Sequence, residues 1–160
     1  MNTHVVFNSE TVAIAGRERV ALLEAGWHSD IVEQAGKSFV HEFSSLSDKQ
    51  VETFSVPGAF ELPLKAQQLA ESGRYAAVVA CALVVDGGIY RHDFVASAVV
   101  DGLMRVQLDT GVPVFSVSLT PHEFETQEHK EFFYRHFVQK GAEAAKACAE
   151  VLQGMSEQVL

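Results

Sequence analysis

The chain has 160 residues, 48% of them hydrophobic, and a formal net charge of -9 from 21 acidic and 12 basic side chains. This length predicts a single domain over residues 1–160 with a substantial core, and the negative charge argues against nucleic acid as a partner. No apolar run approaches about 18 residues and no basic stretch precedes an apolar one at the amino terminus, so we expect neither a membrane span nor a secretory leader.

The amino-terminal half predicts two strand–helix units behind a loose arm. Residues 1–16 combine scattered polar residues with a short apolar run at 12–15, so we expect a loose N-terminal arm that can pack on a neighbouring subunit. Residues 20–25 have the pattern of an apolar strand, and Ser29 begins a helix with apolar side chains at helical spacing. Residues 51–56 predict the second strand, and the helix after it should end at Gly73, since glycine readily takes the left-handed conformation.

The next segments predict a buried central strand and one more strand–helix pair. Residues 75–85 form a nearly continuous apolar run, as expected for a parallel strand covered on both faces. An amphipathic helix from Asp93 should end at Gly111, before a strand at 112–119. Because four strands alternate with helices, we predict an α/β fold, a three-layer α/β/α sandwich around a four-stranded parallel sheet with right-handed crossovers.

Two helices are expected at the carboxyl end, at residues 123–138 and 142–152, with Gly141 between them. The first is polar but carries more aromatic surface than a small monomer can bury behind four strands. We therefore expect a partner subunit to cover its aromatic side chains, which are Phe132, Phe133, Tyr134 and Phe137.

The two cysteines predict the redox environment. Cys81 falls in a strand pattern and Cys148 in a helix pattern, so we expect two buried free thiols rather than a disulfide. Free thiols of this kind are typical of a reducing compartment. We therefore expect a cytoplasmic protein.

The connection after the second predicted strand is the first candidate ligand site. It combines a stiff Pro-Gly turn at residues 57–58 with a lone carboxylate at Glu61. Ligands of open α/β sheets bind where a strand passes into a helix, so a flat ligand can lie on the Ala59 and Phe60 backbone while Glu61 meets its polar edge. The alternative is a tight turn with a solvated acid.

A second candidate site follows the central strand. Gly87 and Gly88 lead into the helix that starts near Asp93, so their backbone amides and the helix terminus can hold a phosphate. Arg91 and His92 add a fixed cation and a titratable base there. The alternative is an ordinary turn next to a solvated Arg-His pair.

Four segments together resemble the lumazine synthase family. They are the strand that ends at Trp27, the Pro-Gly segment at 57–61, the glycine loop at 84–95 and the Gly-Val-Pro-Val sequence at 111–114. The resemblance covers about residues 19–152. Within the predicted fold class it implies the flavodoxin-like lumazine synthase fold.

The resemblance implies a transferase. The reaction condenses 5-amino-6-(D-ribitylamino)pyrimidinedione with 3,4-dihydroxy-2-butanone 4-phosphate to 6,7-dimethyl-8-ribityllumazine and releases phosphate, the penultimate step of riboflavin biosynthesis. No cofactor or metal is implied, and the partners are the two small-molecule substrates and further copies of the chain. The alternative is a non-catalytic flavin- or lumazine-binding protein for storage or scavenging, which would need Trp27 and Glu61 but not His92.

The resemblance also implies roles for individual residues. The phosphate would be held by Gly88 and Ile89 together with a cation from a later helix. Ser116 would face the ring across a subunit boundary. The other residues that would contact the pyrimidine, its ribityl chain or the product ring are Trp27, Ala59, Phe60, Glu61, Leu83, Val84 and Val85.

The catalytic position departs from the family pattern. An ungapped match places Arg91 on the family's catalytic histidine and His92 on the aromatic residue that follows it. Histidine titrates near neutral pH and arginine does not. We therefore assign proton transfer to His92 and phosphate binding or orientation to Arg91, and leave open the reverse assignment.

Three histidines spaced by seven residues, His122, His129 and His136, do not predict a metal site. Seven helical residues span about 10.5 Å, which is too far for two ligands of one ion. Counted forward from residues 112–113, Lys130 instead stands where the family keeps an arginine for the substrate phosphate, with His129 as second choice.

The same region bears on the size of the assembly. In the family five subunits form a ring with active sites between neighbours, and rings either pair or close into a shell of sixty. Counted back from residues 140–141, the family's arginine falls on Phe132, so the chain is two residues longer here than the shell-forming members. The chain thus resembles the decameric type II branch, and we expect pentamers paired into a decamer.

Overall fold

A four-stranded parallel sheet forms the centre of the protein, and the computed structural model describes residues 9–86 and 91–157. The strands lie in the order β2-β1-β3-β4 and are all parallel. Their bounds are β1 Arg19–Ala25, β2 Gln50–Val56, β3 Tyr75–Leu83 and β4 Val114–Leu119.

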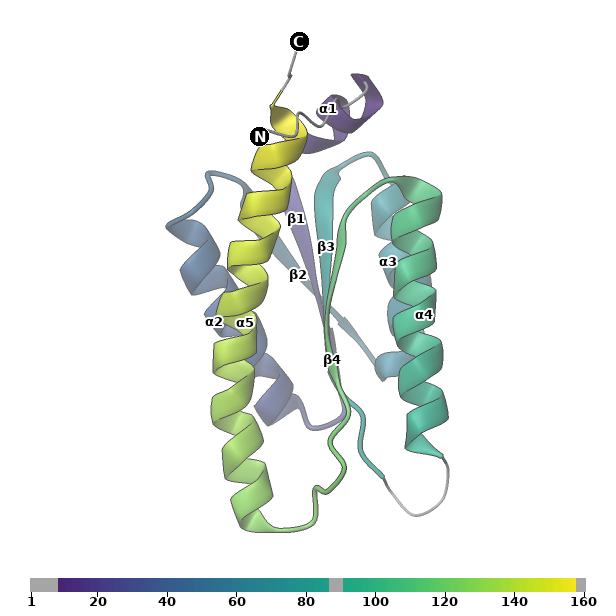
Figure 1. Cartoon of the computed structure of the whole chain (residues 1–160), viewed down its shortest axis with the longest axis vertical. Coiled ribbons are helices and arrows are strands. Elements are labelled where there is room, and N and C mark those ends of the chain that lie inside the picture. Colours follow the sequence, from purple (N-terminus) through teal and green to yellow (C-terminus); the bar gives the residue numbers. More distant parts are fainter. Residues whose placement is uncertain (1–8, 87–90, 158–160) are drawn as a thin grey trace, which may run out of the picture.

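Two pairs of helices cover the sheet, one pair on each face (Figure 1). Helices α2 (Ser29–Ser44) and α5 (Gln127–Ser156) pack together on one face. Helices α3 (Leu62–Glu71) and α4 (His92–Thr110) pack together on the other. The predicted three-layer α/β/α sandwich is therefore confirmed. No helix in the described ranges is long and apolar enough to cross a membrane.

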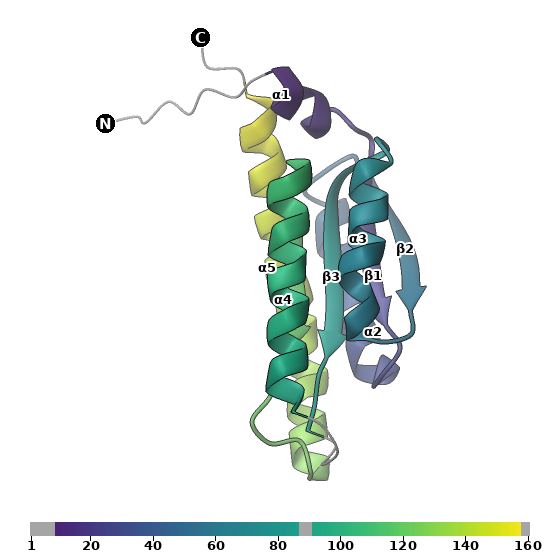
Figure 2. The same ribbon diagram turned by 90° about the vertical axis from the view of Figure 1, so that its right-hand side faces the viewer.

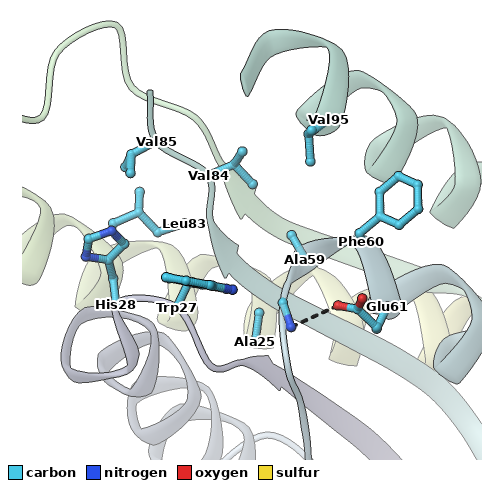
Figure 3. A pocket seen from close by; sticks show the side chains of 11 residues that line it. Ala25, Trp27, His28, Ala59, Phe60, Glu61, Leu83, Val84, Val85 and Val95 are labelled. Carbon is cyan, nitrogen blue, oxygen red and sulfur yellow. Dashed lines mark hydrogen bonds between the residues drawn. The ribbon is translucent and has the colours of Figure 1, made fainter. Parts of the chain in front are cut away.

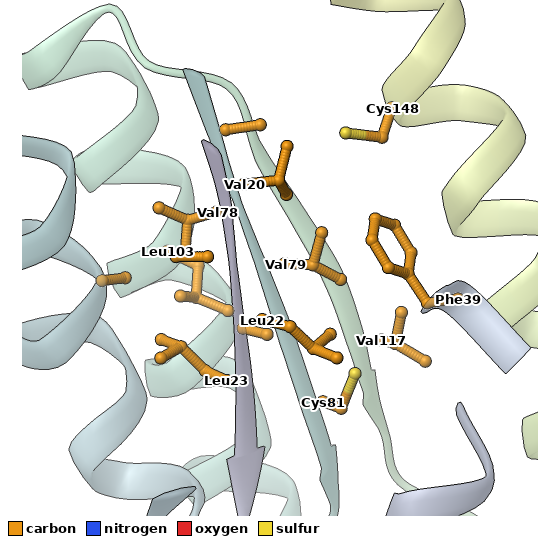
Figure 4. Packing of buried hydrophobic residues seen from close by; sticks show 14 of the residues in the cluster. Val20, Leu22, Leu23, Phe39, Val78, Val79, Cys81, Leu103, Val117 and Cys148 are labelled. Carbon is orange, nitrogen blue, oxygen red and sulfur yellow. The ribbon is translucent and has the colours of Figure 1, made fainter. Parts of the chain in front are cut away.

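Strand β3 lies inside the sheet and every one of its residues is buried, as its apolar run predicted (Figure 2). Its side chains pack with those of β1 on both faces, between α4 on one side and α2 and α5 on the other (Figure 4). Cys81 and Cys148 are buried in this core as free thiols, as predicted. Burial raises the pKa of both thiols, that of Cys148 to about 12.

The two helices on the α3/α4 face end where glycine allows the left-handed backbone. Gly73 follows α3 with φ 80° and Gly111 follows α4 with φ 72°. The N–H of Gly111 donates to the carbonyl oxygen of Gln107. These two predicted helix ends are confirmed, and each returns the chain to the edge of the sheet where the next strand begins.

Helix α5 corrects the prediction of two helices separated at Gly141. It runs for 30 residues without a break, and Gly141 is buried against α2. A Cβ on Gly141 would stand 2.9 Å from both the Cα and the carbonyl carbon of Ala35 and closer still to the carbonyl oxygen. Next to this contact, Ser38 Oγ donates a 2.6 Å hydrogen bond to the Val138 carbonyl. The glycine therefore permits close helix packing and does not end the helix.

The prediction of an exposed aromatic cluster on α5 is also wrong in part. Phe137 is fully buried, and Phe133 is half-buried against Phe124. Only Phe132 and Tyr134 are exposed, at 52% and 45%. Residues four apart on a helix share a face, which is why Phe133 and Phe137 point inward while the other two face outward.

Part of the predicted loose arm is an ordered helix. Residues Ser9–Ala15 form α1, which packs on the carboxyl-terminal part of α5. Ile14 and Ala15 are buried in the core. The Lys49 ammonium donates hydrogen bonds to the carbonyl oxygens of Ala15 and Arg17 at 2.7 and 2.6 Å, and burial lowers its pKa. This part of the chain is therefore held against the domain.

Candidate active site

A pocket of about 340 Å³ lies at the carboxyl edge of the sheet, where parallel strands deliver their connecting loops (Figure 3). It is bounded by the ends of β1 and β3, the segment after β2 and the first turns of α4. Its lining residues are Ala25, Trp27, His28, Gly58, Ala59, Phe60, Glu61, Leu83, Val84, Val85 and Val95.

Trp27 stands at the mouth of this pocket and is not part of the core. It follows β1 by two residues and is 72% exposed. Its pyrrole edge lies against Gly58, where a Cβ would stand 3.1 Å from Trp27 Cδ1 and 3.2 Å from Nε1. Gly58 has an ordinary extended backbone with φ -149°, so the site requires its missing side chain and not its conformational freedom. Gly58 thus makes room for the indole.

Glu61 borders the pocket from the end of a short 3-10 turn, η1 (Ala59–Glu61). Its Oε2 accepts a 2.9 Å hydrogen bond from the backbone N–H of Gly58, drawn as a dashed line in Figure 3. This bond fixes the carboxylate next to Trp27. Within the described residues its other oxygen, Oε1, makes no hydrogen bond, so it is available to a ligand.

The end of β3 supplies an apolar wall made of Leu83, Val84 and Val85. The backbone of Val84 is already engaged, because its N–H donates to the Leu119 carbonyl at 2.9 Å and its carbonyl accepts from Thr120 Oγ1 at 2.7 Å. Val84 therefore presents its side chain to the pocket.

Arg91 and His92, the candidate catalytic pair, stand at the start of α4 and differ in their surroundings. The Arg91 guanidinium makes two hydrogen bonds with the Asp93 carboxylate, at 3.0 and 3.2 Å, and lies 4.3 Å from the Phe94 ring centroid. The hydrogen bond from Arg91 lowers the pKa of Asp93. The His92 imidazole makes no hydrogen bond within residues 9–86 and 91–157, and Val95, one helical turn on, lines the pocket.

His129 and Lys130, the two candidate phosphate cations, also have different environments. The His129 N–H donates to Thr126 Oγ1 at 3.1 Å, and its Nδ1 accepts from the Glu125 and Thr126 N–H groups at 3.3 and 3.5 Å. His129 thereby caps the amino terminus of α5. Lys130 is exposed, and none of the ion pairs of the described residues includes it.

Arg91, His92 and His129 are not among the lining residues of this pocket, and neither are Ser116 and Lys130. Ser116 is exposed on the edge strand β4, in a groove with Lys140 and Glu143. Lys130 borders a different hollow between the first turns of α2 and α5. Gly88 and Ile89 lie outside the described residues. Within one chain, Ser116 and Lys130 therefore lie at two places away from this pocket.

Two residues that line the pocket were not predicted from the sequence. Val95 is signalled only by its position one turn after His92. His28 is the second, and its position directly after Trp27 is the only signal for it in the sequence. It connects β1 to α2 and borders the pocket beside Leu83 and Val85 (Figure 3).

Comparison with known proteins identifies the family. Residues 17–156 match the family model described as 6,7-dimethyl-8-ribityllumazine synthase. The chain is 60% identical to the 6,7-dimethyl-8-ribityllumazine synthase of Rhodococcus erythropolis over 133 residues, which cover 81% of this chain and 86% of that protein. It is 57% identical to 6,7-dimethyl-8-ribityllumazine synthase 2 of Pseudomonas syringae pv. tomato, over 84% of this chain and 81% of that protein. The chain belongs to the 6,7-dimethyl-8-ribityllumazine synthase family.

Proposed function

We propose that this protein condenses 5-amino-6-(D-ribitylamino)pyrimidinedione with 3,4-dihydroxy-2-butanone 4-phosphate to give 6,7-dimethyl-8-ribityllumazine and phosphate. The observation that carries the proposal is the pocket itself, in which an exposed indole, a fixed carboxylate and an apolar wall surround about 340 Å³ in a chain of this family. A volume of this order suits a small heterocycle. Trp27 offers a face for the pyrimidine, and Glu61 with the amides of residues 59–60 offers polar contacts to its edge and ribityl chain.

The reaction requires the protein to hold the two substrates in position and to transfer protons. The 5-amino group adds to the ketone and loses water to form an imine, phosphate leaves, and the ribitylamino nitrogen closes the ring with loss of a second water. Holding two substrates in register supplies most of the rate. We assign the proton transfers to His92, because its imidazole makes no hydrogen bond to the described residues and lies on the helix face that carries Val95. We assign Arg91, which pairs with Asp93, to the orientation of the phosphate substrate.

The assay that tests this function mixes both substrates with the purified protein. We expect lumazine absorbance to rise together with released phosphate in equal amounts. A protein that binds the pyrimidine tightly but forms no product would instead be the non-catalytic binder. The buried free thiols Cys81 and Cys148 support placing this activity in the cytoplasm.

The proposal includes an assembly in which neighbours complete each other's sites. Ser116 and Lys130 lie outside the pocket of their own chain, so a second copy has to bring them to it. Exposed apolar side chains on α4 and α5 are available for such contacts: Val100, Met104, Leu108, Phe132 and Tyr134. We propose rings of five subunits, paired into a decamer.

Size-exclusion chromatography with light scattering should give a mass near ten times the 17.5 kDa of one chain. A mass near five chains or near sixty chains would contradict the decamer and leave the shared site intact. A monomer that turns over both substrates would contradict the shared site as well.

Lys130→Ala should raise KM for the butanone phosphate about 10- to 100-fold, the scale of a charge-assisted hydrogen bond. Affinity for the pyrimidine should stay within about twofold, because Lys130 does not line the pocket around Trp27. Steady-state kinetics with each substrate varied in turn measures both effects. His129→Ala is the matched control: it removes a helix cap, so it should lower the thermal midpoint with a smaller change in KM. Equal losses for both substrates in Lys130→Ala would refute this division of roles.

A further inference from the structure

His28 has an unusual backbone at the point where β1 passes into α2. With φ 54° and ψ 45° it is the only non-glycine residue with positive φ in the described part of the chain. Its carbonyl accepts hydrogen bonds from the N–H groups of Ile31 and Val32, both at 3.0 Å, so the turn is locked into the start of α2. Residues other than glycine take this conformation at an energetic cost, and neighbouring structure has to hold them there.

The His28 side chain is held by an aromatic contact and not by hydrogen bonds. Its imidazole meets the Phe124 ring edge to face, with centroids 5.1 Å apart and an interplanar angle of 77°. Phe124 belongs to the connection between β4 and α5 and packs in turn on Phe133, 5.8 Å away. No hydrogen bond to the His28 ring occurs within residues 9–86 and 91–157. The ring therefore acts as an apolar anchor that ties the β1–α2 turn to a distant segment.

Trp27 lies between this anchor and Gly58. On one side its pyrrole edge abuts Gly58, where a Cβ would stand only 3.1 Å from Trp27 Cδ1. On the other side the left-handed turn at His28 leads into α2, and the indole lines the pocket. Figure 3 shows the indole edge-on between His28 and the segment that carries Ala59 and Glu61. Because Trp27 is 72% exposed, most of its surface makes no contact with the described residues.

We propose that His28 is a positioning residue for Trp27, which acts through its left-handed backbone and its contact with Phe124. The inference rests on the proposed function in one respect, namely that Trp27 stacks on the pyrimidine. His28 does not exchange protons with the substrates in this role. Its contribution is to keep the indole in the orientation that binds the ring, so its loss should weaken pyrimidine binding more than it slows the chemistry.

The test uses the fact that Trp27 is the single tryptophan of the chain, so its fluorescence reports on this site alone. His28→Asn keeps a residue that tolerates the left-handed backbone but removes the ring, and Phe124→Leu removes its aromatic partner. Each variant should raise acrylamide quenching of Trp27. Each should also raise the Kd for a non-reactive pyrimidine analogue, and the pyrimidine KM, about 3- to 10-fold, while kcat stays within about twofold. The double variant should bind no more weakly than either single variant, because the contact is already lost.

Two further variants separate positioning from other roles. His28→Phe restores a ring against Phe124 and should recover most of the wild-type quenching and affinity, with a lower thermal midpoint because phenylalanine tolerates the left-handed backbone less well. His41→Asn, an exposed histidine on the same helix α2 with no ring contact, is the matched control and should change neither. If His28→Phe recovers the quenching but loses kcat, His28 acts chemically and the proposal fails. Unchanged quenching and affinity in both His28→Asn and Phe124→Leu would also overturn it.

The quenching and binding measurements do not depend on turnover. If the wild-type protein has no synthase activity, the proposed function is wrong. The fluorescence and binding of the variants still test the positioning role of His28. Conversely, an active wild-type enzyme with unaffected variants would refute the positioning role alone.

Discussion

Replacing His92 with alanine should lower kcat by about 10²- to 10⁴-fold, the usual contribution of a positioned general acid or base. The structure supports this choice because the His92 imidazole is unengaged within the described residues and stands one turn before Val95 on α4. Saturating both substrates and following lumazine absorbance measures the effect. The pyrimidine Kd should change little, since Trp27 and Glu61 remain in place.

Arg91→Ala is the variant to compare with His92→Ala, because Arg91 is the other candidate for the catalytic role. Its guanidinium stays protonated at neutral pH, so it cannot act as the base that takes up a substrate proton. It also makes two hydrogen bonds with Asp93 and lies over the Phe94 ring. We expect a smaller loss of kcat than for His92→Ala, and a rise in KM for the phosphate substrate. The reverse order of the two variants in kcat would transfer the catalytic role to Arg91.

Gly141→Ala should destabilise the protein by about 3 kcal/mol or more, at or beyond the upper end of the usual cost of overpacking. The added methyl group would overlap the Ala35 backbone, which cannot rotate away as a side chain can. Helices α2 and α5 would have to separate, and their shared core around Phe39 would open. Urea unfolding followed by circular dichroism measures the loss, and failure to obtain folded protein would agree with it.

Gly154→Ala in the same helix is the matched control. A Cβ there meets no atom within 4 Å, and the residue lies near the carboxyl end of α5. Because alanine favours helix over glycine, this change should be neutral or stabilising by up to about 1 kcal/mol. Equal stability of both variants would show that the α2–α5 contact is looser than the structure indicates.

The role of Gly141 could not be predicted from the sequence. A glycine within a helical pattern signals either a helix end or a close approach, and the sequence does not contain the neighbour that decides between them. Gly73 and Gly111 end helices, whereas Gly141 faces the Ala35 backbone. The fold class was predictable because hydrophobic period and strand–helix alternation are local properties of the chain.

The pocket was predictable for a similar reason and to a similar extent. Parallel strands bring their carboxyl ends to one edge, so residues directly after β1, β2 and β3 had to meet there. The contact between His28 and Phe124 was not predictable, because it joins residues almost a hundred positions apart by side-chain packing. Ser116 and Lys130 have roles that still depend on an assembly and stay predictions.

Because α5 is one continuous helix, a small change in its angle where it crosses α2 at Gly141 displaces its amino-terminal end. Lys130 lies 11 residues from the crossing, about 16 Å along the helix axis, so a tilt of about 5° there would move Lys130 by more than about 1 Å. Displacements of this size can cost about 100-fold in rate when they misplace a group that holds a substrate. Under the proposed role of Lys130, a glycine that touches no substrate therefore governs how accurately the far end of the helix presents this cation to the phosphate.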